Sequence, residues 1–274
     1  MNKQLMDTGR RWLKASALTV ALLVSVPFIY SANGTHWRDA DRSSAGLAPD
    51  PAEHPEAVIQ VYAARTFGWR GALAVHTWIS TKAANAEIYT THHVVGFRSR
   101  RNLPVVVSQM DIPDRAWYGN KPVILVDLRG YQAEQLIPKV LEAVASYPYA
   151  ERYVMWPGPN SNTFTAWVGR QVPQLELDMP STAIGKDYLA GTIFDNTPGG
   201  SGYQLSVYGL LGMSLGRHEG LELNLLGLNF GINPLKLQLK LPGVGVLGRS
   251  GSKLVEDVAA NDCVEQVTES PSIC

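Results

Sequence analysis

Residues 72–79 read ALAVHTWI and residues 157–164 read PGPNSNTF. The first stretch is an apolar strand with His76 near its centre. The second is a turn that opens a helix at Asn160 or Ser161, two residue types that suit a helix N-cap. A nucleophile at a helix N-terminus benefits from the helix dipole and from free backbone N–H groups, and a histidine on an adjacent strand can take its proton. The two stretches therefore predict an α+β domain with a candidate site where strand and helix meet.

The surrounding sequence predicts a papain-like antiparallel sheet with helices over residues 57–190. Strands are expected from their β-branched and aromatic content at residues 57–63, 71–80, 88–97, 105–108 and 123–127. Apolar residues recur at helical spacing over residues 131–146, and because Pro138 interrupts a helix interior, we expect the regular helix to begin there. A second helix is expected over residues 163–169.

A turn near residues 82–87 suggests a third member of the candidate site. If the strands on either side pair around this turn, His76 lies opposite position 92, so that His92 would orient the His76 imidazole. A shift of register by one residue would place His93 there instead.

Residues 199–248 have a different sequence pattern, in which leucines alternate with small or polar residues. This pattern predicts a glycine- and leucine-rich β-meander of three or four strands, with residues 216–220 at a hairpin tip. The leucines could pack on the preceding domain. They could also face lipid or a partner, since a leucine face backed by uncharged residues is unusual on a free surface.

The N-terminal segment predicts an uncleaved transmembrane helix. Four basic residues precede the uncharged apolar run of residues 15–32, which is just long enough to span a bilayer. A cleaved signal peptide is the alternative. The basic flank places the N-terminus in the cytoplasm and the body outside it. We therefore expect an anchor over residues 1–33, a linker over residues 34–56 and a disordered tail over residues 249–274.

Composition excludes several classes of function. The chain has 274 residues with 24 basic and 24 acidic side chains, so no nucleic-acid partner is expected. Its two cysteines, Cys263 and Cys274, stand in the polar tail without other metal-ligand residues. No glycine-rich phosphate loop leads from a strand into a helix. We therefore expect no metal and no cofactor.

Locally, the chain resembles the permuted papain-like group that includes relatives of lecithin retinol acyltransferase. The resemblance rests on His76, His92 and the later pattern Asn160-Ser161-x-x-Phe164. Members of that group carry a histidine on one strand, a polar residue on the next, and Asn-Cys-x-x-Phe at the start of a helix. The resemblance implies that His76 is the base, His92 the orienting residue and Ser161 the residue at the nucleophile's position.

Serine stands where those enzymes carry cysteine, and this leaves two functions open. A serine stays protonated and needs a base during attack, whereas a cysteine next to a histidine becomes a thiolate. One function is a Ser-His hydrolase or acyltransferase acting on an amide or ester of a lipoprotein or peptidoglycan, with Asn160, Asn162 and Trp156 as binding residues. The other is a catalytically inactive envelope-binding or assembly module, in which Ser161 caps a helix and His76 is a core histidine.

Longer motifs are spread over nearly the whole chain. They read WRxAxRSSAG at residues 37–46, FGWRG at 67–71, WPGPNSNTF at 156–164, AIGKDY at 183–188 and LExNLLG at 221–227. With these motifs the chain resembles a bacterial membrane-anchored family known only as domain of unknown function 3750. The resemblance implies a bacterial membrane-anchored protein and no established activity. Together with the basic flank of residues 15–32, it leads us to expect a single-pass protein of the bacterial inner membrane with its body in the periplasm. The expected partners are that membrane and an envelope lipid, lipoprotein or peptidoglycan component.

Overall fold

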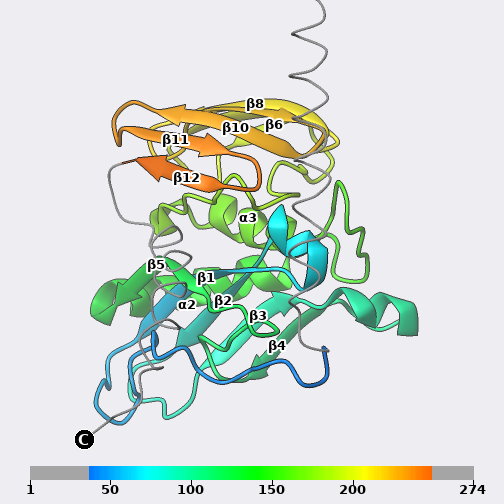
Figure 1. Cartoon of the computed structure of the whole chain (residues 1–274). Helices are drawn as coiled ribbons and strands as arrows, with labels where there is room; N and C mark the ends of the chain where they lie inside the picture. The colour runs from blue at the N-terminus through cyan, green and yellow to red at the C-terminus, as the bar shows by residue number, and fades with distance from the viewer. Residues whose placement is uncertain (1–36, 249–274) are drawn as a thin grey trace, which may run out of the picture.

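The structure is a computed structural model that describes residues 37–248. Two antiparallel sheets lie one above the other, with a helix and loops between them (Figure 1). This arrangement confirms the predicted α+β class. The predicted anchor at residues 1–33 and the predicted tail at residues 249–274 lie outside the described residues. Within residues 37–248, no helix combines the length and the apolar character that a membrane span requires.

The first sheet has five strands in the order β4-β3-β2-β1-β5. The strands are β1 (Val58–Arg65), β2 (Val75–Lys82), β3 (Thr90–Val94), β4 (Val106–Met110) and β5 (Val123–Arg129). Each overlaps a strand predicted from the sequence. The structure differs at two places, where 3-10 helices replace predicted strand: η1 (Gly68–Ala72) before β2 and η2 (Gly96–Arg101) after β3.

Two helices pack on one face of this sheet. Helix α2 (Gly130–Ala145) contacts β1 and β5, and α3 (Ser161–Gln171) contacts β2 and β3. The prediction that the regular helix starts at Pro138 was wrong, because α2 continues through Pro138. Pro138 is exposed, so the helical carbonyl that lacks its usual N–H partner lies on the side where water can replace that partner. The short helix η3 (Pro173–Leu175) follows α3.

The alternation of side chains along β1 and β2 divides the five-stranded sheet between two cores. Val61 and Ile79 belong to the main core, together with Phe164 of α3. Tyr62 and Trp78 point the other way and form a smaller cluster. Their rings stack with centroids 5.4 Å apart. Because successive side chains of a strand point to opposite faces, odd-numbered residues of β2 face α3 and even-numbered residues face away from it.

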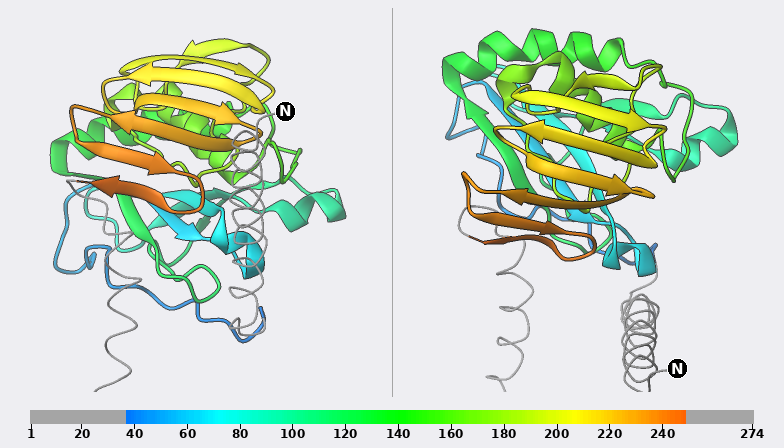
Figure 2. Two further views of the ribbon diagram at one scale, coloured as in Figure 1. Left: turned by 45° about the horizontal axis from the view of Figure 1, so that its top comes forward. Right: turned by 90° about the horizontal axis from the view of Figure 1, so that it is seen from above.

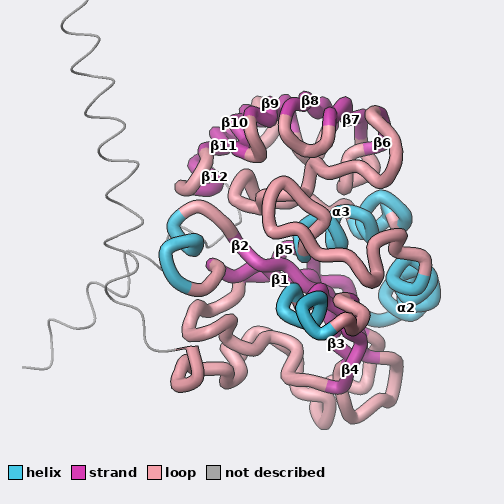
Figure 3. The backbone as a smooth tube through the Cα atoms, turned by 90° about the vertical axis from the view of Figure 1, so that its right-hand side faces the viewer, coloured by secondary structure: helices cyan, strands magenta, loops and turns pink. Residues whose placement is uncertain are grey.

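The second sheet has seven strands in sequential order from β6 to β12. They are β6 (Phe194–Asn196), β7 (Gly202–Val207), β8 (Leu211–Gly216), β9 (Gly220–Leu225), β10 (Leu228–Asn233), β11 (Gln238–Leu241) and β12 (Gly245–Gly248). The predicted meander is therefore correct in kind, but three or four strands was too few. Figure 3 shows the seven-stranded sheet from the side, arching over α3. In the view from above, it lies in front of the five-stranded sheet (Figure 2, right).

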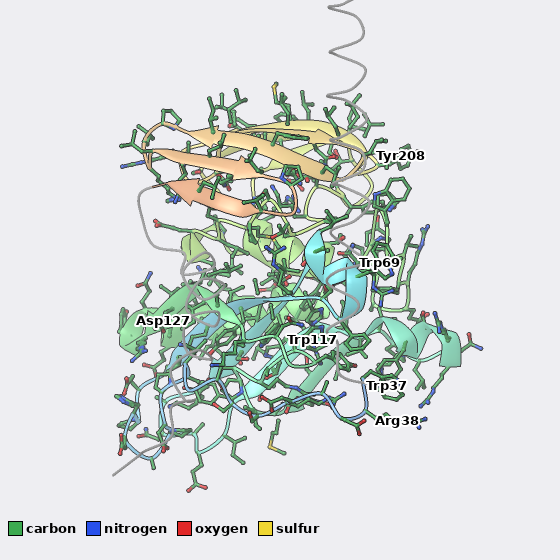
Figure 4. The ribbon with its side chains drawn as sticks, in the orientation of Figure 1. Trp37, Arg38, Trp69, Trp117, Asp127 and Tyr208 are labelled. Carbon is green, nitrogen blue, oxygen red and sulfur yellow. The ribbon has the colours of Figure 1, made fainter. Side chains whose placement is uncertain are left out.

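The polarity of the seven-stranded sheet is the reverse of what a sheet packed on a protein core usually shows. The side chains that face the body are buried and polar, namely Gln204, Ser206, Ser214, Glu222, Asn224, Asn229, Asn233 and Lys240. The alternate side chains are large, apolar and exposed (Figure 4). Of the two arrangements left open by the sequence, the leucines therefore face outward, and the sheet packs on the body through its polar side.

Candidate functional site

The N-terminus of α3 is fixed by Asn160. Its side-chain oxygen accepts hydrogen bonds from the backbone N–H groups of Asn162 and Thr163, and the Thr163 hydroxyl accepts one from the Asn160 backbone N–H. The Asn160 amide nitrogen donates to the carbonyls of Met155 and Ile184, at 3.0 and 3.1 Å. All hydrogen-bonding capacity of this side chain is thus used within the fold, so Asn160 is a structural cap rather than a ligand-binding group.

The other two predicted binding residues are also engaged in the fold. The Asn162 amide nitrogen donates to the carbonyls of Val75 and Ile184, at 3.0 and 2.8 Å. The Trp156 indole nitrogen donates to the carbonyl of Leu226, 3.0 Å away, and so ties the loop before α3 to the seven-stranded sheet. Asn162 is buried, whereas 48% of Trp156 is exposed, so only Trp156 presents a surface that a ligand could reach.

His76 lies on the other face of β2. Its ring stacks on Trp117, with centroids 3.7 Å apart and an angle of 12° between the planes. The imidazole is buried, and its Nε2 atom has no hydrogen-bond partner among the described residues. Burial, with a smaller contribution from His93 and Arg115, holds the pKa of His76 well below its usual value. His76 is therefore a neutral histidine inside an aromatic cluster.

The strand register corrects the predicted pairing of the histidines. β2 and β3 pair with Ile79 opposite His92, so position 76 does not lie opposite position 92. His92 shares the face of Ile79, where its two ring nitrogens lie 3.1 Å from the Thr81 hydroxyl and 2.8 Å from the Ser108 hydroxyl. The ring of His93 instead meets His76 edge to face, with centroids 5.8 Å apart. Of the two histidines left open by the sequence, His93 is the neighbour of His76.

Ser161 lies on the face of β2 opposite to His76. The hydroxyl of Thr77, the next residue on β2, lies 3.4 Å from the Ser161 carbonyl and 3.0 Å from the Asn162 side-chain oxygen. The residue of β2 that faces the start of α3 is therefore Thr77, and a threonine cannot act as a base for Ser161 at neutral pH. The structure brings His76 and His93 together, but it does not bring His76 and Ser161 together.

A second group of polar residues lies between α3 and the seven-stranded sheet, and we call it the ionic layer: Asp178, Lys186, Asp187, Glu222 and Lys240. Lys186 donates to one carboxylate oxygen of Glu222, and Lys240 donates to the other oxygen at 2.7 Å. Lys240 also donates to Asp178, again at 2.7 Å. Lys186, Asp187, Glu222 and Lys240 are each no more than 2% exposed, so these charges balance one another away from water.

The ionisation of this layer follows from its charge pairs. Burial lowers the pKa of Lys186, but Asp187 and Glu222 outweigh burial and raise it above its usual value. Burial raises the pKa of Glu222, but Lys186 and Lys240 outweigh burial and lower it. The Asp187 carboxylate accepts hydrogen bonds from the amides of Asn224 and Asn229, each at 2.7 Å, and from Gln204. Lys186 and Glu222 are thus both charged at neutral pH, and three side-chain amides of the seven-stranded sheet donate to the neighbouring Asp187 carboxylate.

The outward side of the seven-stranded sheet is predominantly apolar, although the exposed Asn196 of the edge strand β6 lies on it opposite Tyr203. We call its apolar part the apolar face. Its members are Phe194, Tyr203, Leu205, Val207, Leu211, Met213, Leu215, Leu221, Leu223, Leu225, Phe230, Ile232 and Leu239, all of them exposed. Strand pairing aligns them in rows across the sheet, such as Leu205, Met213, Leu223 and Phe230. A contiguous apolar surface of this extent marks an interaction site in a folded protein.

The sequence reasoning noticed the leucines but missed the ionic layer. In the sequence, Lys186 and Asp187 are adjacent charged residues, and nothing in their surroundings shows that both are buried. Glu222 and Lys240 each stand between two leucines of an alternating run. Such charged residues can face the body only if buried counter-charges meet them there. Glu222 and Lys240 partly neutralise each other, and the other counter-charges come from Asp178 and Lys186, which lie far away in the sequence.

Residues 56–188 match the model of a family described as a protein of unknown function, DUF3750. The match covers the five-stranded sheet, both helices and part of the ionic layer, and it supports the family resemblance predicted from the sequence. The seven-stranded sheet lies beyond the matched residues. No curated protein and no solved structure gives a significant match to the chain.

Proposed function

We propose that this chain is a catalytically inactive assembly module of the bacterial cell envelope that works by docking through its apolar face. The observation that carries the proposal is the reversed polarity of the seven-stranded sheet. Most polar side chains on the inward side of that sheet are hydrogen-bonded or ion-paired within the body, so the apolar side is left as a surface of the finished fold. A soluble sheet normally exposes its polar side, because burying the apolar side is the main source of stability.

The location in the envelope rests on the N-terminal sequence. The apolar run of residues 15–32 and the basic residues before it favour an anchor in the inner membrane, with the body in the periplasm. In that location the body would stand beside envelope lipids, lipoproteins and peptidoglycan. The assembly function is favoured over hydrolysis because Ser161 of α3 packs on one face of β2 while His76 points from the other. In addition, the side chains of Asn160 and Asn162 are fully engaged in hydrogen bonds within the fold.

The test measures whether the apolar face is covered in cells. Leu223→Cys places a thiol at the middle of the face, and Leu141→Cys on α2 is a matched control, since the two leucines are 47% and 44% exposed. Both variants are made in a chain whose own cysteines are replaced by Cys263→Ser and Cys274→Ser. We expect a membrane-permeant maleimide to label Leu141→Cys in intact cells and to label Leu223→Cys only after denaturation. Equal labelling of the two thiols in cells would overturn the proposal.

A further inference from the structure

We infer that the apolar face is covered by the same face of a second copy of this chain. The inference rests on the proposed function, because it names the partner of the surface on which that function depends. Three properties of the face carry it: its area, its lack of charge and its place in the molecule.

The area of the face is sufficient for a stable dimer. The sheet has seven strands of up to six residues, and strands lie about 4.8 Å apart with about 3.4 Å per residue. The face therefore measures roughly 30 by 20 Å, or about 600 Å² per copy and about 1,200 Å² for a pair. Stable protein interfaces bury about 1,200–2,000 Å² in total. Exposed apolar residues in the turns at the perimeter, among them Tyr208 and Leu226, enlarge the area further.

The chemistry of the face suits an identical partner. No member of the apolar face carries a charge, so two copies related by a two-fold axis bring no like charges together. Obligate homodimer interfaces resemble a protein core cut in half, and a face made of leucine, valine, methionine and aromatic side chains has that composition. Surfaces that bind anionic lipid headgroups instead combine apolar residues with lysine and arginine, and the apolar face contains neither.

The place of the face in the molecule also favours a second copy over the anchoring membrane. The described chain begins at Trp37, which lies beside the five-stranded sheet and away from the apolar face (Figure 4). Only residues 34–36 separate Trp37 from the predicted anchor at residues 1–33, so Trp37 lies within about 14 Å of the end of the anchor even if the chain is fully extended. A bilayer that held residues 15–32 would therefore lie near Trp37, and the apolar face would remain free for a protein partner.

The strand order predicts which residues meet in the dimer. β9 is the middle strand of the seven, and Leu223 is near its centre, flanked by Met213 on β8 and Phe230 on β10. Face-to-face sheets pack about 10 Å apart with interdigitating side chains. A two-fold axis through the middle of the face brings Leu223 of one copy next to Leu223 of the other.

Disulfide cross-linking tests this arrangement in the full chain. Leu223→Cys and Leu141→Cys, in the background without Cys263 and Cys274, are oxidised in membranes of cells that produce them and separated on non-reducing gels. We expect Leu223→Cys to form a covalent dimer and Leu141→Cys to remain monomeric. Adding Leu141→Glu to the Leu223→Cys chain should leave the dimer band unchanged, whereas adding Met213→Glu should reduce it at least tenfold.

The outcomes separate this inference from the proposed function. If the Leu223→Cys thiol is protected from maleimide in cells but forms no covalent dimer, a different partner covers the apolar face. That result overturns the inferred dimer and leaves the proposed assembly function intact. Equal cross-linking of Leu223→Cys and Leu141→Cys reflects random collision and also overturns the second copy. A Leu223→Cys thiol that maleimide labels freely removes both proposals.

Discussion

The hydroxyl of Thr77 lies 3.0 Å from the side-chain oxygen of Asn162 and 2.9 Å from the hydroxyl of Thr165. These contacts hold the start of α3 against the odd-numbered side of β2. His76 immediately precedes Thr77 on the same strand, so its ring must point to the opposite side, where Trp117 covers it. The position of one buried threonine thus decides that the histidine and the serine of this chain do not meet.

Ser161 and Asn160 should behave in opposite ways when they are replaced by alanine. Asn160→Ala removes a helix cap and two further amide hydrogen bonds, so it should lower the free energy of unfolding by about 2–4 kcal/mol. Ser161→Ala should change it by less than about 1 kcal/mol, as expected for a helix residue outside the cap. Urea unfolding measures both values. We also expect no labelling of Ser161 by a fluorophosphonate; labelling that Ser161→Ala abolishes would show that the serine is reactive after all.

Glu222→Ala should be among the most damaging substitutions in the chain. It leaves the ammonium groups of Lys186 and Lys240 facing each other without their shared carboxylate. Breaking a buried ion pair on one side costs about 3–5 kcal/mol, because the remaining charge is uncompensated. Glu134→Ala on the exposed side of α2 is the control and should change stability by no more than about 0.5 kcal/mol. Denaturant unfolding of both variants checks the prediction, which is wrong if their midpoints coincide.

Acid should destabilise the protein at a pH where most carboxylates are still ionised. Burial lowers the pKa values of His92 and His93 to about 4, whereas an unfolded histidine titrates near 6.5. A lowered histidine pKa means that the unfolded chain binds more protons, so this contribution to stability is complete above pH 6.5 and is lost as the pH falls toward 4. The loss should be on the order of 2 kcal/mol per histidine between pH 7 and pH 5.

Unfolding free energies of histidine variants at the two pH values check this. His92→Asn should flatten the dependence on pH, because it removes a buried histidine with a lowered pKa. A wild-type stability that is constant from pH 7 to pH 5 would contradict the assignment.

Trp117→Ala should open the cluster around His76. The indole stacks directly on the imidazole and contributes to its burial, so its removal should raise the pKa of His76 toward its ordinary value. The lost packing should cost about 2–3 kcal/mol, somewhat less than for a fully buried tryptophan. Histidine NMR titration measures the first effect and thermal unfolding the second. Trp69→Ala removes a half-exposed tryptophan elsewhere on the surface and should produce neither change.

The sequence was informative wherever local pattern determines structure. β-branched and aromatic content located all five strands of the first sheet, and alternating leucines located the meander. Asn160 and Ser161 together marked the start of α3. The side of β2 that His76 faces could not be predicted, because a strand with apolar residues on both sides reads the same in either orientation. The register of β2 and β3 depends on the loop that joins them, and this loop is longer than the predicted turn, since β2 ends at Lys82 and β3 begins only at Thr90. The orientation of the meander depends on the ion pairs of Glu222 with Lys186 and of Lys240 with Asp178. These partners are distant in the sequence, so no local pattern predicts the pairs.

The outermost strands of the seven-stranded sheet are short, since β6 has three residues and β12 has four. An unpaired strand edge can recruit another chain by backbone hydrogen bonding, and repeated recruitment produces fibres. Edges this short offer few unpaired backbone groups, so growth sideways in the plane of the sheet is disfavoured. When two apolar faces pack on each other, by contrast, each face is fully covered and no part of it remains to bind a third copy. Association through the apolar face therefore stops after one partner. The many exposed leucines of this sheet then do not lead to polymerisation.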